Sequence, residues 1–158
     1  SNVTEMRFMF AAGESNGVDT QTIFNQSINN WDVSNVNTMN SMFQNNVNFD
    51  QPLNNWDVSN VISMRWMFAA ATSFNQSIGT WDVSNVTDMR SMFLNAYIFD
   101  QSLNSWDVSN VTDMSFMFFD AYIFDQPLSN WDVSNVISMR GLFELELNLM
   151  IGLYLINH

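Results

Sequence analysis

The residues best suited to chemistry are five aspartates that recur at a spacing of 25 residues. They are Asp32, Asp57, Asp82, Asp107 and Asp132. Carboxylate oxygens are calcium ligands, so a stacked column of aspartates could offset its own repulsion by binding that ion. Aspartate at a turn also accepts hydrogen bonds from nearby backbone N–H groups. The turn interpretation is favoured, because no segment resembles a dedicated calcium loop.

Side chains for catalysis are scarce. The chain has no cysteine and no lysine, and its single histidine is the terminal His158. The usual pairs of nucleophile and base cannot be assembled from these residues. Paired carboxylates recur identically along the chain, which is typical of a structural element rather than of one active site. The sequence therefore predicts a protein that is not an enzyme and has no cofactor, with calcium as the one ion left open.

The charge balance narrows the class of partner. The net charge is −12, from 16 acidic residues and four arginines. This balance argues against nucleic acid and anionic membrane surfaces, and it is compatible with basic protein surfaces. The apolar tail near the end of the sequence is too short to span a bilayer, so no membrane insertion is expected from this segment.

Each aspartate belongs to the word Trp-Asp-Val-Ser-Asn-Val, and a fixed period of this length is the signature of stacked repeats. Within one repeat, Trp31 and Val33 alternate with polar residues, which predicts a short strand. Val36, Met39 and Phe43 fall on one stripe of a short helical turn. The predicted fold class is α/β, a right-handed solenoid of 25-residue coils, each with a short strand and a short helical turn.

The expected organisation has two parts. Residues 1–143 form a repeat solenoid of about five to six coils, with a loop insertion near residues 11–22. Residues 144–158 do not follow the repeat and are expected to be an atypical closing or edge segment. This Leu-rich tail could also pair with another chain, so an oligomer is one expected outcome.

The repeated string Phe-Asn-Gln-x-Ile/Leu-x-x-Trp-Asp-Val-Ser-Asn-Val-Thr-Asp-Met-x-x-Met-Phe resembles a bacterial surface-protein repeat with a nominal length of about 26 residues. That repeat occurs in Listeria- and mycoplasma-type lipoproteins and is related to BspA-like leucine-rich repeats. The resemblance covers roughly Ser1 to Phe143. It implies a leucine-rich-repeat-like solenoid at the cell surface or outside the cell, with adhesion or protein binding as its role. It brings no catalytic residues with it.

Candidate partner-binding residues lie in the columns that vary between repeats. Trp66 and Phe116 share one column, which is expected to point away from the core. Two further columns carry apolar residues in the middle repeats, namely Tyr97 with Tyr122 and Leu94 with Phe119. Exposed aromatic and aliphatic side chains in a cluster are typical of a partner-binding patch.

A single column holds all the arginines, which are Arg7, Arg65, Arg90 and Arg140. We expect them to form surface ion pairs with acids such as Asp88 and Asp113. Together the features predict a non-enzymatic surface or secreted repeat scaffold for protein recognition or adhesion. The alternatives are a calcium-stabilised or glycan-binding module, and a purely structural spacer.

Overall fold

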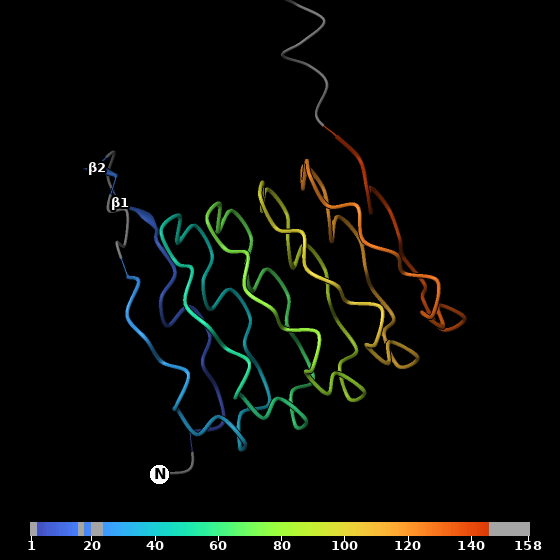
Figure 1. Cartoon of the computed structure of the whole chain (residues 1–158), viewed down its shortest axis with the longest axis horizontal. Coiled ribbons are helices and arrows are strands. Elements are labelled where there is room, and N and C mark those ends of the chain that lie inside the picture. The colour runs from blue at the N-terminus through green and yellow to red at the C-terminus, as the bar shows by residue number, and fades with distance from the viewer. Residues whose placement is uncertain (1–2, 16–17, 20–23, 146–158) are drawn as a thin grey trace, which may run out of the picture.

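The computed structural model describes residues 3–15, 18–19 and 24–145. Among these residues the regular strands are β1 (Glu14–Ser15) and β2 (Val18–Asp19), which pair antiparallel. The rest of the described backbone runs in turns and irregular segments. Successive coils lie side by side from one end of the molecule to the other (Figure 1). The sequence repeat is therefore the structural unit, and the molecule is a stack of these units.

A ladder of single-residue parallel bridges joins neighbouring coils. The bridged residues, in order along the stack, are Glu5, Thr38, Ser63, Asp88, Asp113 and Ser138. Each step along this ladder covers 25 residues, the repeat length, except the first step from Glu5 to Thr38. Residues at the same position of successive repeats are thus bridged to one another, and this keeps neighbouring coils in register.

Beyond each bridge, backbone N–H groups donate alternately to the next coil and within their own coil. The N–H groups of Ser41 and Phe43 donate to the carbonyl oxygens of Arg65 and Met67, both at 2.9 Å. Between these two residues, the Met42 N–H closes a turn within its own coil by donating to the carbonyl oxygen of Met39 at 3.2 Å. Backbone hydrogen bonds therefore connect neighbouring coils, although these segments do not form a continuous strand.

The predicted α/β fold, a leucine-rich-repeat-like solenoid with a strand and a helical turn in each coil, is wrong. The described residues contain no helix, and the only strands belong to the β1–β2 pair. Ser41 and Asn45 have φ values of +57° and +59°, in the left-handed region that interrupts a right-handed helix. Their N–H groups reach the next coil instead of a carbonyl four residues back. The segment around Trp31 and Val33, which was expected to be a strand, runs directly into a tight turn. In that turn the Val36 N–H donates to the carbonyl oxygen of Val33 at 2.9 Å.

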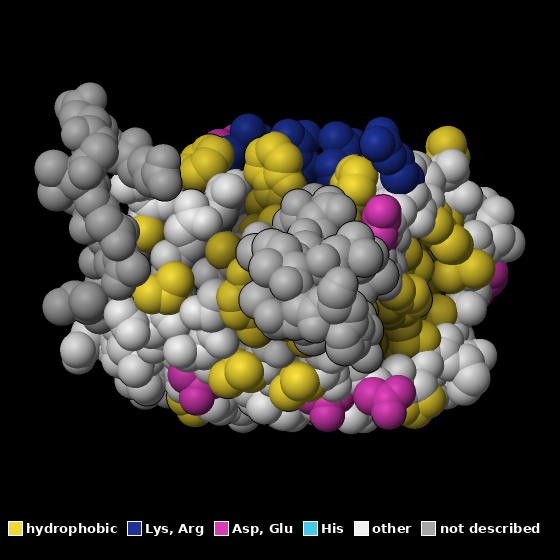
Figure 2. Space-filling view, turned by 90° about the horizontal axis from the view of Figure 1, so that it is seen from above, with side chains coloured by type: hydrophobic (Ala, Val, Ile, Leu, Met, Phe, Trp, Pro, Cys, Tyr) yellow, Lys and Arg dark blue, Asp and Glu magenta, His cyan; other side chains and the backbone are white. Residues whose placement is uncertain are grey.

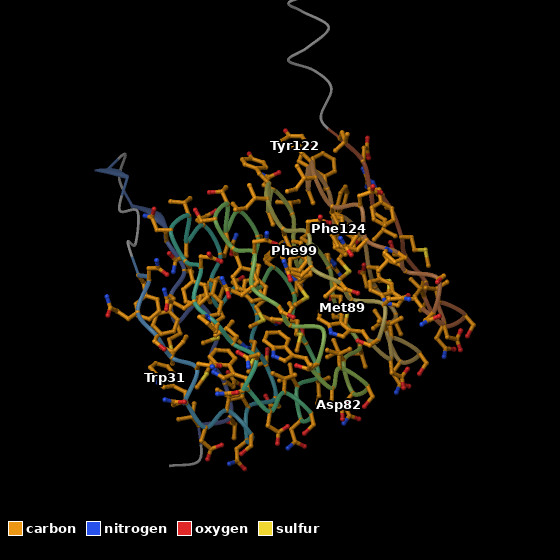
Figure 3. All side chains as sticks on the ribbon, in the orientation of Figure 1. Trp31, Asp82, Met89, Phe99, Tyr122 and Phe124 are labelled. Atoms are coloured by element: carbon orange, nitrogen blue, oxygen red, sulfur yellow. The ribbon has the colours of Figure 1, made fainter. Side chains whose placement is uncertain are left out.

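Columns of aromatic rings fill the core. The rings of Phe43 and Phe68, one coil apart, have centroids 5.4 Å from each other and are almost parallel. Within a coil, the Phe43 ring also stacks on the Phe49 ring at 4.1 Å. Phe99 and Phe124 continue the second column inside the stack (Figure 3), with centroids 6.1 Å apart. Such pairs stabilise by about 0.5–1.5 kcal/mol each beyond area burial, so the stacking strengthens every coil-to-coil interface.

The repeated tryptophan links the core to the backbone of the preceding coil. The indole Nε1–H of Trp81 donates to the carbonyl oxygen of Leu53 at 3.0 Å. The equivalent bonds are made by Trp56, Trp106 and Trp131. In the first coil Trp31 is 42% exposed, whereas Trp81 is 4% exposed. A buried indole is thereby satisfied by a carbonyl that the neighbouring coil supplies.

The two segments that break the repeat are described only in part. β1 and β2 lie inside the insertion expected near residues 11–22. Residues 16–17 and 20–22 of that insertion, and residues 146–158 of the expected closing segment, lie outside the described residues. The closing role of the tail and its pairing with another chain stay predictions.

We predict that Asn46→Ala stabilises the fold. Asn46 is fully buried, and neither its Nδ2 nor its Oδ1 has a hydrogen-bond partner among the described residues. The next three coils carry alanine at this position, as Ala71, Ala96 and Ala121. Removing the unpaired amide should raise the free energy of unfolding by about 1–2 kcal/mol, measured by urea denaturation. The reverse change in the next coil, Ala71→Asn, should lower it; a destabilised Asn46→Ala would contradict the argument.

Candidate functional site

Each aspartate of the candidate calcium column binds the serine two residues after it. Asp57 Oδ1 accepts the backbone N–H of Ser59 at 3.1 Å and the Ser59 hydroxyl at 2.6 Å. Asp82, which lies at the rim of the stack (Figure 3), makes the same two bonds with Ser84. The backbone bond recurs at Asp32, Asp107 and Asp132. The column therefore closes a turn in every coil.

These hydrogen bonds favour the charged form of four carboxylates, those of Asp32, Asp57, Asp107 and Asp132. The Ser59 hydroxyl, followed by the Ser59 N–H, holds the pKa of Asp57 below its usual value. The same two donors from the following serine lower the pKa of Asp32, Asp107 and Asp132. Among the described residues, no group of three or more His, Cys, Asp or Glu side chains is placed to hold a metal ion. Calcium binding by this column stays an untested prediction, and in the observed geometry the Oδ1 atom of each aspartate accepts the hydrogen bonds of a turn.

A different face of the stack carries an apolar hollow of about 470 Å³. It is lined by Gln44, Trp66, Ala69, Ser91, Leu94, Phe116 and Phe119. Four of the six residues predicted to bind a partner therefore lie together, namely Trp66, Leu94, Phe116 and Phe119. All four are half-buried, in contrast to the fully buried phenylalanines of the core.

The hollow arises because large and small residues alternate along one column. The equivalent positions are occupied by Phe8, Ser41, Trp66, Ser91, Phe116 and Gly141, and all six residues have positive φ. Neighbouring coils are about 4.8 Å apart, so Trp66 and Phe116 stand about 10 Å apart with the small Ser91 between them. A second column, three residues further along each coil, supplies the remaining lining residues.

Glycine at the end of that column gives the Phe116 ring its space. A Cβ on Gly141 would lie 2.6 Å from Phe116 Cδ1, closer than van der Waals contact allows. The φ of Gly141 is +62°, which glycine adopts without strain. Phe116 thus leans over the last described coil.

Two arginine side chains pack against the aromatic walls but are not among the residues that line the hollow. Arg65 lines a smaller neighbouring hollow of about 180 Å³, which it shares with Trp66 and Phe8. The Arg65 guanidinium carbon lies 4.3 Å from the centre of the Trp66 ring, and that of Arg140 lies 5.4 Å from the centre of the Phe116 ring. Figure 2 shows the arginines in one row beside exposed hydrophobic side chains. A cation above a ring face is attracted by the ring quadrupole, so the arginines and the aromatic walls are held together.

Comparison with known sequences identifies the family. Residues 1–93, and again residues 76–151, match the family described as Mycoplasma protein of unknown function, DUF285. The chain belongs to this family. The mycoplasma-type part of the expected resemblance is therefore confirmed. No curated protein and no solved structure matches the chain.

The other two predicted residues of this DUF285 chain, Tyr97 and Tyr122, do not line the hollow. They are 38% and 55% exposed, and their rings stack with centroids 5.1 Å apart. They lie three residues beyond Leu94 and Phe119 along their coils and form a separate exposed pair. As for membrane association, the described residues include no helix of the length and apolarity needed to cross a bilayer.

Sequence reasoning missed the polar and small residues of the hollow. Gln44, Ala69 and Ser91 line it but carry no feature that singles them out as binding residues. The available signal was the alternation of large and small residues between repeats in the column of Ser91. That alternation produces a hollow only if neighbouring coils lie in register. The ladder of bridges between the coils shows that they do.

We predict that acid destabilises this protein in part through the aspartate turns. A carboxylate whose pKa is lowered by folding contributes stability above its unfolded pKa, about 3.9, and this contribution is lost as the pH falls through the folded pKa. The melting temperature should therefore fall as the pH drops below about 4. In a variant with Asp57→Asn and Asp107→Asn, the amide oxygen keeps the acceptor but does not titrate. Its melting temperature should fall less steeply in circular dichroism scans, and identical slopes would refute the assignment.

Proposed function

We propose that this chain is a non-enzymatic recognition scaffold that binds a protein partner through the apolar hollow. The observation that carries the proposal is the grouping of Trp66, Leu94, Phe116 and Phe119 around one open concavity. Apolar side chains at the centre of a concave patch, with polar groups at its edge, are typical of protein-binding sites. The partner is expected to insert an apolar side chain between the two aromatic walls.

Packing supports a binding role for these side chains over a structural one. The core columns keep phenylalanine in coil after coil, and Phe43, Phe68 and Phe93 are fully buried. The column of Trp66 holds serine in two other coils, so the stack forms without an aromatic residue there. Large apolar side chains that the fold does not require, gathered around one hollow, favour a site for another molecule.

Two further considerations support the proposal. The chain lacks cysteine and lysine and has one histidine, which leaves few groups for nucleophilic or acid–base chemistry. The repeat word also resembles Listeria-type and BspA-like surface repeats, which favours a place at the cell surface or outside the cell, in an adhesion role. Protease treatment of intact cells that make the full-length protein would test this location, since a protein inside the cell would stay uncut.

We predict that Trp66→Ser with Phe116→Ser abolishes binding without unfolding the chain. Serine is already present in this column as Ser41 and Ser91, with the same positive φ. Peptides selected from a random display library on the wild-type chain should lose at least about tenfold in affinity for the variant, as expected for central interface residues. Fluorescence anisotropy measures the affinity, and circular dichroism checks the fold.

The matched control is Ile62→Thr. Ile62 is 51% exposed and does not line the hollow, and the next two coils carry Thr87 and Thr112 at its position. This change also removes exposed apolar surface, and it should leave the affinity unchanged. Equal losses in the control and in the hollow variant, or selected peptides that bind both variants as well as wild type, would rule out the hollow as the binding site.

A further inference from the structure

The four arginines of this column fall into two classes. Arg90 forms an ion pair with Asp113, with 2.6 Å between Nη2 and Oδ2, and Arg7 Nε lies 3.5 Å from Glu5 Oε2. Arg65 and Arg140 form no ion pair among the described residues and lie against Trp66 and Phe116 instead. The expected pairing of the column with acids therefore holds for Asp113, but Asp88 pairs with no arginine in the described part of the chain. Two cations that pack against the aromatic walls of the hollow are thus left without an ion-paired carboxylate among the described residues.

We propose that the hollow recognises an acidic segment of a partner protein, in which an apolar residue fills the hollow and a neighbouring Asp or Glu binds Arg65 or Arg140. This inference rests on the proposed function and specifies its partner. A guanidinium held against an aromatic face keeps its N–H edge free to donate two parallel hydrogen bonds to a carboxylate. The ring contact also limits the rotamers of the arginine, which lowers the entropy lost on binding.

The position of the acids sharpens the proposal. Glu144 is close to the Phe116 end of the hollow, since its Oε2 lies 3.2 Å from the Cβ position of Gly141. A ligand carboxylate at that end meets a like charge, whereas Arg65 at the Trp66 end has no acidic group within ion-pair distance among the described residues. Arg65 is therefore the primary contact for the ligand carboxylate, and Arg140 the weaker one.

Because the net charge of the chain is −12, attraction of an acidic segment is restricted to short distances from the two arginines. Over distances of a Debye length or more, the chain repels an acidic partner, and salt screens that repulsion. At contact distance the guanidinium dominates, because the interaction energy grows as the separation falls. Binding of an acidic segment is thus favourable next to Arg65 and Arg140 and unfavourable over the surrounding surface, which provides specificity for this site.

Selection from a random peptide display library on the wild-type chain tests the proposal. The best peptide is then synthesised in two forms, one as selected and one with each Asp and Glu replaced by Asn and Gln. Their affinities are measured for wild type, Arg65→Gln, Arg140→Gln and the control Arg7→Gln, whose arginine is already paired with Glu5. The selected form should bind wild type about fivefold more tightly than its neutral form, and Arg65→Gln should remove that difference. Arg140→Gln should reduce it less, and the control should leave it unchanged.

Two other outcomes separate the two proposals. Peptides that lose affinity on Trp66→Ser, yet bind wild type equally in acidic and neutral form, would overturn the acidic-segment proposal and leave the recognition scaffold standing. Peptides whose affinity does not depend on Trp66 or Phe116 would overturn both. A gain in affinity of the acidic form on Arg65→Gln would also contradict the assignment of Arg65.

Discussion

Neighbouring coils must share backbone hydrogen bonds, and the rest of the structure depends on this requirement. The N–H groups of Ser41, Phe43 and Asn45 all donate to the next coil. The chain achieves this spacing by entering the left-handed region twice in each inner coil, as at Ser41 and Asn45. Asparagine tolerates that region better than most residues, and serine, tryptophan and phenylalanine occupy it here because the neighbouring coils fix the backbone. The shared register then places identical core side chains on top of one another.

The same register produces the candidate binding surface. A column that stacks identical residues makes a flat wall or a ladder, as the core phenylalanines do. A column that alternates Ser41, Trp66, Ser91 and Phe116 makes walls with a gap between them. The hollow is therefore encoded by the departure of a few residues from the repeat. The repeat itself supplies the scaffold that holds these residues at fixed spacing.

Charge is organised by column as well. The aspartate that follows each repeated tryptophan accepts hydrogen bonds from the serine two residues later, as at Asp57 and Asp82. Its negative charge therefore supports a local turn. The arginines form one row, in which Arg90 is neutralised by Asp113 whereas Arg65 rests on an aromatic ring. A strongly acidic chain can in this way keep cations against the aromatic walls of an apolar hollow. Desolvation beside those walls strengthens charge–charge contacts relative to those on open surface.

By itself, the sequence determined the repeat length, the core columns and most of the candidate surface. Large apolar residues recurring at 25-residue intervals have to stack, because one coil cannot bury them alone. The sequence did not determine the coil's local structure. The spacing of Val36, Met39 and Phe43 suits a helical turn equally well, and only the hydrogen bonds offered by adjacent coils draw Ser41 and Asn45 into the left-handed region. Tertiary structure also decided that Trp66 and Phe116 share one hollow while Tyr97 and Tyr122 form another contact, since that depends on which columns adjoin in space.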